Sequence, residues 1–299
     1  MDFKKITIND KGIIESYTKN WVIENNDLSF TTLYLWGKHG KIMYAEQDGA
    51  LFFHYDFPDN PQFFLPPVTK NPNGDYKAAV DAAIREMRSM GIAPCFRSAA
   101  APFLDPLKES ICNAVITPTP FNNDYVYLAE SLITLKGKKL HSKRNHINSF
   151  LAEHSDWEYV SIDENNFDEC MALYEQWSEG KTEPTLEEYD ERLTVELAIK
   201  HMHELGLFGG GIRLGGRLCA FSVGECTTSD MVTVHIEKAD ASINGLFPLI
   251  NQQFVLHESR GASFINREDD MGIDGLRRAK QSYQPCRMIE KYMLTLAED

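Results

Sequence analysis

Residues 208–237, FGGGIRLGGRLCAFSVGECTTSDMVTVHIE, decide the fold class. Two apolar runs, 208–214 and 217–225, flank a pair of glycines, which accept the positive φ angles of a tight hairpin turn. A third run, 231–237, alternates between apolar and polar residues, as a half-buried strand does. The stretch therefore predicts two strands joined by a hairpin, with a third strand after them.

Helices and strands continue on both sides of this stretch. Upstream, a strand at 157–162 precedes two helices, the second of which ends at Gly206, a residue suited to left-handed helix termination. Downstream come a helix with Pro248 in its first turn, a strand at 263–267, a further helix and a strand at 287–296. The C-terminal half is thus expected to have the order β-α-α-β-β-β-α-β-α-β, an α/β fold.

The N-terminal half gives a weaker version of the same order. Its clearest element is a helix whose apolar residues recur at helical spacing from Tyr76 to Met87. The candidate strands lie at 33–36, 41–46, 50–55, 62–65, 95–98, 114–117 and 125–128. Because 299 residues exceed what one compact core usually serves, we expect two domains, at 1–135 and 156–299. A basic helix at 136–155 would link them.

Composition narrows the class of protein. A hydrophobic share of 43% is enough for sizeable cores. The net charge of −14 disfavours non-specific binding to DNA or to anionic lipid. The chain shows no signal peptide and no apolar run of about 18 residues, and its six cysteines lack Cys-x-x-Cys spacing. We therefore expect a cytoplasmic protein with buried thiols, no metal site and no integral membrane association.

Residues 136–146 form a basic segment, KGKKLHSKRNH, that holds no acid. Ammonium and guanidinium groups pair with phosphate, so the segment is a candidate site for CoA or for the end of a tRNA. The alternative is a solvated helix face. The candidate donor-binding residues here are Lys143, Arg144 and Asn145.

A turn at 239–247, ADASINGLF, joins a strand to a helix. Asn244 and Gly245 permit unusual φ angles, so backbone N–H groups there could bind an anion at the helix N-terminus. The alternative is a glycine required only for packing.

The segment 265–285, INREDDMGIDGLRRAKQSYQP, concentrates polar residues where a strand ends, the usual place for a site in α/β domains. Lys280 and Tyr283 are three apart and are expected to share one helix face, while Arg278 points elsewhere. The alternative is a capped, charged helix. The polar residues at the strand end are Asn266, Arg267, Glu268 and Asp269.

In the strand 231–237, His235 and Glu237 are two residues apart and are expected on one face. The pair could supply a base or orient an amine, or it could be a structural salt-bridge partner.

Together, GKKLHSKRNHINSF (137–150), HIEKAD (235–240) and NREDDMGIDGLRRAKQSYQP (266–285) resemble the DUF2156 group. These are soluble relatives of the phosphatidylglycerol lysyltransferase C-terminal domain, which is itself similar to the FemABX transferases. The resemblance implies an α/β (α+β) fold of two tandem GNAT-like acyltransferase domains, with mixed central sheets flanked by helices. It also implies a transferase that moves an aminoacyl group from aminoacyl-tRNA, its co-substrate, to an unknown amine or hydroxyl acceptor.

Under this hypothesis Glu237 orients or deprotonates the nucleophile, and Tyr283 donates a proton. Lys280 acts with them as a catalytic residue that binds phosphate or the oxyanion. The residues expected to bind the donor or its phosphates are Lys143, Arg144, Asn145, Asn244, Gly245, Arg267 and Arg278. Substrate orientation falls to His235, Asn266, Glu268 and Asp269. The alternatives are an acetyl-CoA-dependent N-acetyltransferase, which would use the turn 239–247 for pyrophosphate, and a non-catalytic ligand-binding module.

Overall fold

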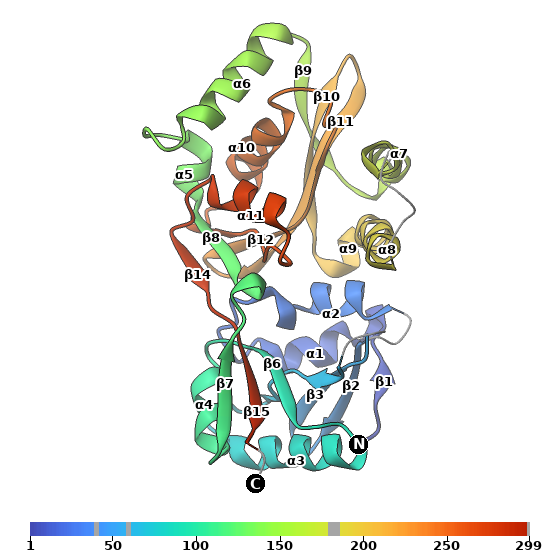
Figure 1. Ribbon diagram of the computed structural model, residues 1–299. Helices are drawn as coiled ribbons and strands as arrows, with labels where there is room; N and C mark the ends of the chain where they lie inside the picture. Colours follow the sequence, from blue (N-terminus) through green and yellow to red (C-terminus); the bar gives the residue numbers. More distant parts are fainter. Residues whose placement is uncertain (39–41, 58–60, 179–185, 298–299) are drawn as a thin grey trace. The chain divides into compact units, whose positions relative to one another are not determined.

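The computed structural model describes residues 1–38, 42–57, 61–178 and 186–297 (Figure 1). The chain divides into two compact units. Unit 1 consists of Met1–Asp124 together with Ile289–Asp299, and unit 2 consists of Tyr125–Met288. Each unit contains its own sheet and its own helices. The fold is therefore a mixed α/β fold with two helix-flanked mixed sheets, as expected.

Unit 1 is built on a mixed sheet. Its strand order is β1 (Lys4–Lys5), β2 (Ile42–Gln47), β3 (Ala50–Tyr55), β4 (Phe63–Phe64), β6 (Cys95–Ala99), β15 (Tyr292–Leu296) and β7 (Ala114–Pro118), with β5 (Val68–Thr69) beside β3. Its helices include α1 (Lys11–Thr18), α2 (Phe30–Trp36), α3 (Tyr76–Ser89) and α4 (Leu104–Ser110). Among the described residues of this unit, β4 and β6 are the only strands that pair in parallel, and the connection between them contains β5 and α3.

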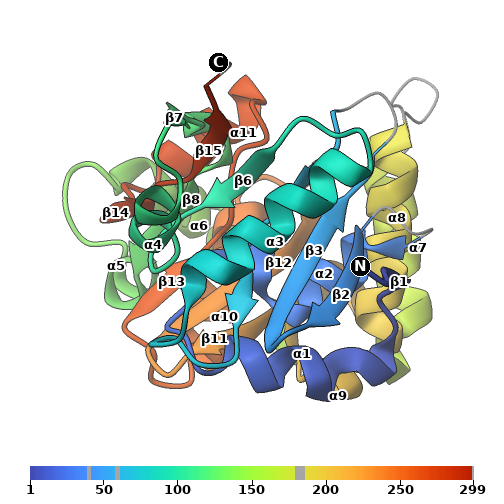
Figure 2. The same cartoon turned by 90° about the horizontal axis from the view of Figure 1, so that it is seen from below.

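Helix α3 is the element of unit 1 that the sequence predicts best. The Asp75 carboxylate caps it by accepting a hydrogen bond from the Ala78 N–H, and its predicted apolar face is buried. Figure 2 shows α3 lying over one face of the sheet.

The strand expected at 33–36 is wrong, because these residues belong to helix α2. Residues Phe30 to Leu35 are all buried, so the helix shows no polar face and no 3.6-residue alternation that the sequence could display. The Ser29 side chain caps the helix by accepting a hydrogen bond from the Thr32 N–H.

Unit 2 has a second mixed sheet. Its strand order is β14 (Arg287–Ile289), β8 (Asp124–Leu128), β13 (Phe264–Asn266), β12 (Met231–Ala239), β11 (Arg217–Thr228), β10 (Phe208–Leu214) and β9 (Trp157–Ile162). Its helices include α5 (Ala129–Thr134), α6 (His141–Glu153), α7 (Phe167–Ser178), α8 (Leu186–Lys200), α9 (Met202–Leu205), α10 (Leu246–Glu258) and α11 (Asp274–Gln281). The predicted hairpin is confirmed: β10 and β11 are antiparallel, and Gly215 and Gly216 have φ angles of 54° and 81°.

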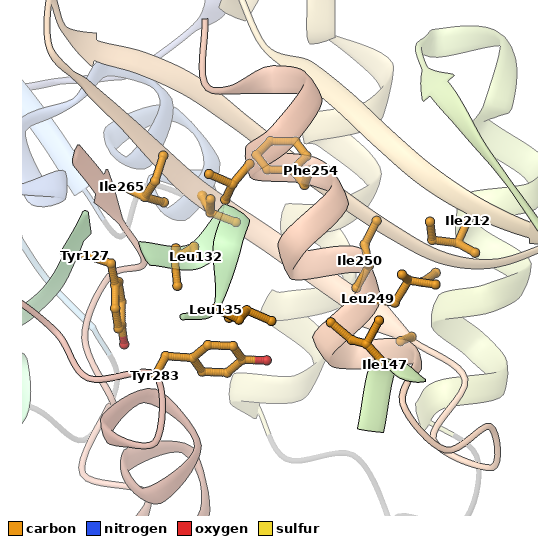
Figure 3. Packing of buried hydrophobic residues seen from close by; sticks show 14 of the residues in the cluster. Tyr127, Leu132, Leu135, Ile147, Ile212, Leu249, Ile250, Phe254, Ile265 and Tyr283 are labelled. Carbon is orange, nitrogen blue, oxygen red and sulfur yellow. The ribbon is translucent and has the colours of Figure 1, made fainter. Parts of the chain in front are cut away.

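Helix α10 connects β12 to the parallel strand β13 and covers the core of unit 2. Figure 3 shows Leu249, Ile250 and Phe254 of this helix among the buried residues of that core, which also includes Ile212 and Ile265. Burial of a side chain of this size contributes about 1.5–3 kcal/mol to stability. The core therefore fixes β12 and β13, whose ends carry the polar residues described below.

The division into units differs from the boundaries expected at 135/136 and 155/156. Strand β8 lies in the sheet of unit 2, beside β13, and α6 packs against α10 within the same unit rather than forming a separate linker. The expected single strand 287–296 is two strands, β14 in unit 2 and β15 in unit 1. Strand β15 lies between β6 and β7, where it hydrogen-bonds with both.

Lys291 fixes the start of β15 within unit 1. Its side chain is fully buried and its ammonium group forms ion pairs with Asp124, at 2.7 Å, and with Asp27. It also donates to the Asn26 Oδ1 atom at 2.8 Å. One lysine that directly precedes β15 thus pairs with two carboxylates from distant parts of the chain.

Cys170 and Cys219 are buried as expected, but Cys112, Cys226 and Cys286 are exposed, and all six cysteines are free thiols. Within the parts of the chain that the structure describes, no helix combines the length and the apolar character needed to span a bilayer.

Replacing Lys291 with methionine should destabilise the protein by about 3–5 kcal/mol, because it removes the buried ammonium that pairs with the buried carboxylate of Asp124. Urea denaturation of the full chain measures the loss, and Lys19→Met, at an exposed lysine of the same unit, is the control. A loss no larger than that of the control would contradict the structural role of Lys291.

Candidate functional site

Strand β12 contains a β-bulge at His235. Its pairing with β11 runs from Val223 opposite Ile236 to Gly224 opposite Val234, so that His235 is the extra residue. A bulge shifts the alternation of side chains by one position. Before His235 the even-numbered residues of β12 face α10, and after His235 the odd-numbered residues do.

Because of this bulge, Glu237 faces α10. Val234 belongs to the core beneath that helix, and Glu237, three positions later, contacts Asn251 of the same helix. In a regular strand an odd step would place these two residues on opposite faces. His235 instead contacts Glu225 and Glu268. The expectation that His235 and Glu237 share a face is therefore wrong.

The Glu237 carboxylate is the centre of a buried polar arrangement. Its Oε1 atom accepts a hydrogen bond from Arg267 Nη2 at 2.8 Å, and its Oε2 atom accepts one from Asn251 Nδ2 at 3.0 Å. The side chains of Glu237 and Arg267 are only 14% and 11% exposed. Charged hydrogen bonds of this kind are strong when water is excluded.

Two aromatic rings and a lysine complete the arrangement. The guanidinium of Arg267 lies 4.9 Å from the ring centre of Tyr283 and 5.8 Å from that of Tyr127. The Lys143 Nζ atom lies 4.1 Å from the centre of the Tyr283 ring. Figure 3 shows the Tyr283 ring near Leu135, at the margin of the core.

We call Lys143, Glu237, Asn251, Arg267 and Tyr283 the Glu237 cluster. Four of its five members are predicted from the sequence, and the structure brings them together from α6, β12, the end of β13 and the turn after α11. Sequence reasoning missed Asn251. A signal was available: an amide at position 251, between Ile250 and Phe254, interrupts the apolar face of α10.

Two polar atoms of the cluster are buried and, among the residues that the structure describes, have no hydrogen-bond partner: Arg267 Nη1 and Asn251 Oδ1. The first is a donor and the second an acceptor. A buried unsatisfied group costs about 1–3 kcal/mol, and more when it is charged. A bound molecule that supplies the missing hydrogen-bond partners would offset this cost.

The electrostatics of the cluster favour a proton donor and an anion. Burial raises the pKa of Tyr283, so its hydroxyl stays protonated at neutral pH. Burial, and then the charge of Arg267, lower the pKa of Lys143, although Glu237 opposes this effect. Two cations thus share one carboxylate in a partly desolvated space, and a bound anion would stabilise both.

Lys280 contacts the loop that carries Arg267. Helix α11 ends at Gln281, so Tyr283 lies in the turn after it, and the expectation that the two share a helix face is wrong. The Lys280 ammonium is buried and donates to the backbone carbonyls of Arg267, at 2.5 Å, and of Asp269. Lys280 therefore positions the loop that carries Arg267.

This loop adopts an irregular path. Glu268 and Met271 have positive φ angles of 57° and 51°, which cost free energy outside glycine. The Asn266 side chain accepts a hydrogen bond from the Glu268 N–H at 2.7 Å. Within the same loop, Asp269 accepts one from the Met271 N–H at 3.1 Å. Asn266 and Asp269 therefore shape the loop.

Asp270, which the sequence analysis did not include among the site residues, anchors the loop through its carboxylate. Its buried carboxylate accepts hydrogen bonds from the Arg277 guanidinium at 3.0 and 3.1 Å and from the Tyr125 hydroxyl at 2.7 Å. Burial and the bond to Asp270 raise the pKa of Tyr125 to about 12.

The other predicted donor-binding residues lie outside the Glu237 cluster. Arg144 donates to the carbonyls of Leu135 and Gly137, Asn145 contacts the His141 ring, and Arg278 is exposed. Asn244 contacts His146. Gly245 has a φ of +83°, and a Cβ atom there would lie 2.2 Å from the His146 carbonyl oxygen. Close packing of α6 on this turn thus accounts for the glycine.

His235 joins two carboxylates next to the loop. Its Nε2 and Nδ1 atoms lie 3.0 Å from Glu225 and 2.8 Å from Glu268. Burial alone would lower the pKa of His235, but the hydrogen bonds to both glutamates outweigh burial and raise it to about 10. The imidazolium therefore holds Glu268, the residue after Arg267, at neutral pH.

This shift predicts a pH dependence of stability. Because the folded pKa of about 10 exceeds the ordinary value of 6.5, the contribution is fully present below 6.5 and is lost as the pH rises through 10. The free energy of unfolding should fall by up to about 1.4 kcal/mol per pH unit in that window. Denaturation across it should show this slope in the native chain and in the control His203→Gln, but not in His235→Gln. Equal slopes in all three would contradict it.

Comparisons with known proteins identify the family of the chain and relatives that share its fold. The family model described as phosphatidylglycerol lysyltransferase, C-terminal, matches residues 22–295. A solved conserved protein of unknown function from Bacteroides thetaiotaomicron is 33% identical, with a TM-score of 0.88 over 99% of this chain and 100% of that one.

More distant structures share the fold. L-PGS from Bacillus licheniformis is 12% identical, with a TM-score of 0.68 over 97% of this chain and 93% of that one. FemX is 10% identical, with a TM-score of 0.57 over 99% and 98% of the two chains.

A curated relative, an uncharacterized protein of Mycoplasmoides gallisepticum, is 25% identical over 180 residues. The match covers 58% of this chain and 56% of that relative's length. The family model, in contrast, extends over both units, including β15 in the sheet of unit 1. The chain belongs to the phosphatidylglycerol lysyltransferase C-terminal family, DUF2156.

Proposed function

We propose that the protein transfers an aminoacyl group from aminoacyl-tRNA to an amine or hydroxyl acceptor, and that the Glu237 cluster binds the aminoacyl group. The observation that carries the proposal is the pair of buried atoms without partners, Arg267 Nη1 and Asn251 Oδ1. Arg267 Nη1 needs an acceptor, and Asn251 Oδ1 needs a donor. Both side chains bind the same carboxylate, so a single small group can serve both.

The family and the fold support the coarser statement, an acyltransferase related to lysyl-phosphatidylglycerol synthase and FemX. The donor and the acceptor are the finer part of the proposal, and the chemistry of the Glu237 cluster supports the donor. An aminoacyl ester carries an α-ammonium group and a carbonyl oxygen on adjacent carbons. These are the donor and the acceptor that the cluster lacks.

In this arrangement the α-ammonium group donates to Asn251 Oδ1 and to Glu237, and the ester carbonyl accepts from Arg267 Nη1. Attack of the acceptor amine or hydroxyl on that carbonyl creates an oxyanion. Arg267, held by Glu237 and excluded from water, stabilises this charge as it develops. Loss of one such donor typically slows acyl transfer by about 10²–10³-fold.

Completing the transfer requires that the ester bond break and that the leaving ribose oxygen receive a proton. Tyr283 is the candidate to supply it, because its hydroxyl is protonated at neutral pH and its ring lies beside the Arg267 guanidinium. Lys143, stacked on the Tyr283 ring, supplies positive charge for a phosphate of the tRNA end. The proton released by the nucleophile leaves through solvent or the amine acceptor itself.

For the acetyl-CoA alternative, the turn 239–247 would have to bind pyrophosphate. The backbone carbonyl of His146 packs against Gly245 in that turn, and a carbonyl oxygen carries partial negative charge that repels an anion. The geometry therefore favours the aminoacyl donor.

Thermal denaturation with small donor analogues tests the assignment. Amino acid amides, with a free α-amine, should raise the melting temperature, whereas N-acetylated amides and acetyl-CoA should not. At a concentration about a hundredfold above Kd, a ligand specific for the folded state adds about 2.7 kcal/mol. Asn251→Ala should abolish the shift, and Arg278→Ala, at an exposed arginine, should keep it. A shift with acetyl-CoA alone would favour the acetyltransferase.

Two further variants separate a catalytic residue from a positioning residue. Tyr283→Phe should leave stability nearly unchanged, because it removes one oxygen and keeps the buried ring. It should slow discharge of aminoacyl-tRNA to added hydroxylamine by about 10²–10⁴-fold. Lys280→Met should instead lower stability by about 1–3 kcal/mol, since two carbonyls lose their donor. Discharge by Tyr283→Phe at the native rate, with amide binding intact, would remove Tyr283 from the mechanism.

A further inference from the structure

Unit 1 contains a cavity of about 400 Å³ that shares no residue with the Glu237 cluster. Its walls come from the β2–β3 turn with the start of β3, from the residues that follow β5, and from one face of α3, which lies over the sheet in Figure 2. Small-molecule sites typically have volumes of about 300–1,000 Å³. We call this space the α3 cavity; the residues that give it its chemical character include Asp48, Lys70, Asp75, Ala78, Ala82 and Arg85.

Helix α3 contributes a wall of small apolar side chains. Ala78, Ala82 and Arg85 follow one another at steps of four and three residues, so they share one face of the helix. The facing wall includes Gly49 and Ala50 of the β2–β3 hairpin. Packed elements usually interdigitate their side chains. Here the small residues on both walls leave the space open, and its apolar surface suits the apolar part of a ligand.

Two cations line the α3 cavity. Neither Lys70 nor Arg85 forms an ion pair with any residue that the structure describes. The Lys70 ammonium lies 5.4 Å from the centre of the Tyr17 ring. Long helical side chains extend toward the helix N-terminus, and for Arg85 this is the direction of Ala82 and the rest of the cavity. Both cations can therefore pair with a bound anion.

The two carboxylates of the lining already accept hydrogen bonds from the protein. Asp75 accepts one from the Ala78 N–H at 3.0 Å, as the cap of α3, and Asp48 accepts one from the Gln47 amide at 3.1 Å. The cavity therefore favours a negative group of a ligand over a positive one. The same two carboxylates make a singly charged anion more favourable than a doubly charged phosphate.

The net charge of −14 has little influence at this range. Salt screens exposed charges beyond about 8 Å at physiological ionic strength, so a small ion in the cavity responds mainly to the groups that line it. Among these groups, the cations are the ones that lack an oppositely charged partner.

We propose that the α3 cavity binds a small organic acid, with its carboxylate on Arg85 and its apolar body against the alanine face of α3. A guanidinium pairs with a carboxylate through two parallel hydrogen bonds. Lys70 adds positive charge from another wall, and Ala50 and Phe52 of β3 extend the apolar surface. The site is independent of the proposed aminoacyl transfer, because all of its residues lie in unit 1.

Calorimetric titration of the full chain tests the ligand class. Indole-3-acetate and hexanoate are the probes, and indole-3-acetamide and hexanamide have the same shapes without the charge. At least one of the two acids should bind, and its amide should bind about tenfold more weakly or less, because hydrogen bonds to charged groups are the stronger ones. Failure of both acids to bind, or equal binding of acid and amide, would overturn the proposal.

Substitution of the guanidinium locates the carboxylate. Arg85→Gln should weaken binding of the acid about tenfold or more. Arg88→Gln removes the same charge from the same helix at an exposed arginine that does not line the cavity, and should leave the affinity within about twofold of the native value. Equal affinities in the two variants would contradict the role of Arg85.

Ala82→Leu tests whether the space itself is the site. A leucine there projects into the cavity, so binding of the acid should be lost, whereas urea denaturation should show a free energy of unfolding no lower than that of the native chain. Retained binding in this variant, or a clear loss of stability, would overturn the proposal. Inorganic phosphate that binds as tightly as the acid would also overturn it, because the apolar walls would then contribute nothing.

Discussion

The buried carboxylate of Glu237 is the constraint on which unit 2 depends. A charge removed from water must be matched by hydrogen bonds and an opposite charge, and here Asn251 and Arg267 supply them. Glu237 reaches these partners only because the bulge at His235 turns it toward α10. The placement of Arg267 requires in turn that the loop after β13 keep its irregular path.

That loop is held from several sides by groups that leave Arg267 Nη1 without a hydrogen-bond partner among the described residues. Lys280 holds two of its carbonyls, Asp270 joins it to Arg277 and Tyr125, and the His235 imidazolium holds Glu268. The cost of two residues at positive φ is offset by these contacts. Such preorganisation suits a site that must meet developing charge without rearranging.

The chain passes between the two units twice. The chain leaves unit 1 before β8, which completes the sheet of unit 2 beside β13, and returns for β15, which lies between β6 and β7. Lys291, directly before β15, fixes this return, because its buried ammonium pairs with the buried carboxylate of Asp124 and with Asp27. The same strand leaves β7 at the edge, where its uncharged sequence is exposed.

The sequence by itself determined the α/β class, the β10–β11 hairpin and helix α3, since glycine pairs and 3.6-residue periodicity are local signals. It also identified Lys143, Glu237, Arg267 and Tyr283, because polar residues concentrated at strand ends and in a basic segment stand out from composition. Only the tertiary structure decided which of these residues meet. The bulge at His235, the burial of Lys280 against carbonyls, the helix at 30–36 and the division of 287–296 between two sheets all depend on partners distant in sequence. The periodicity of a short segment cannot predict such partners, because these hydrogen bonds and this burial form only when residues distant in sequence come together in the folded chain.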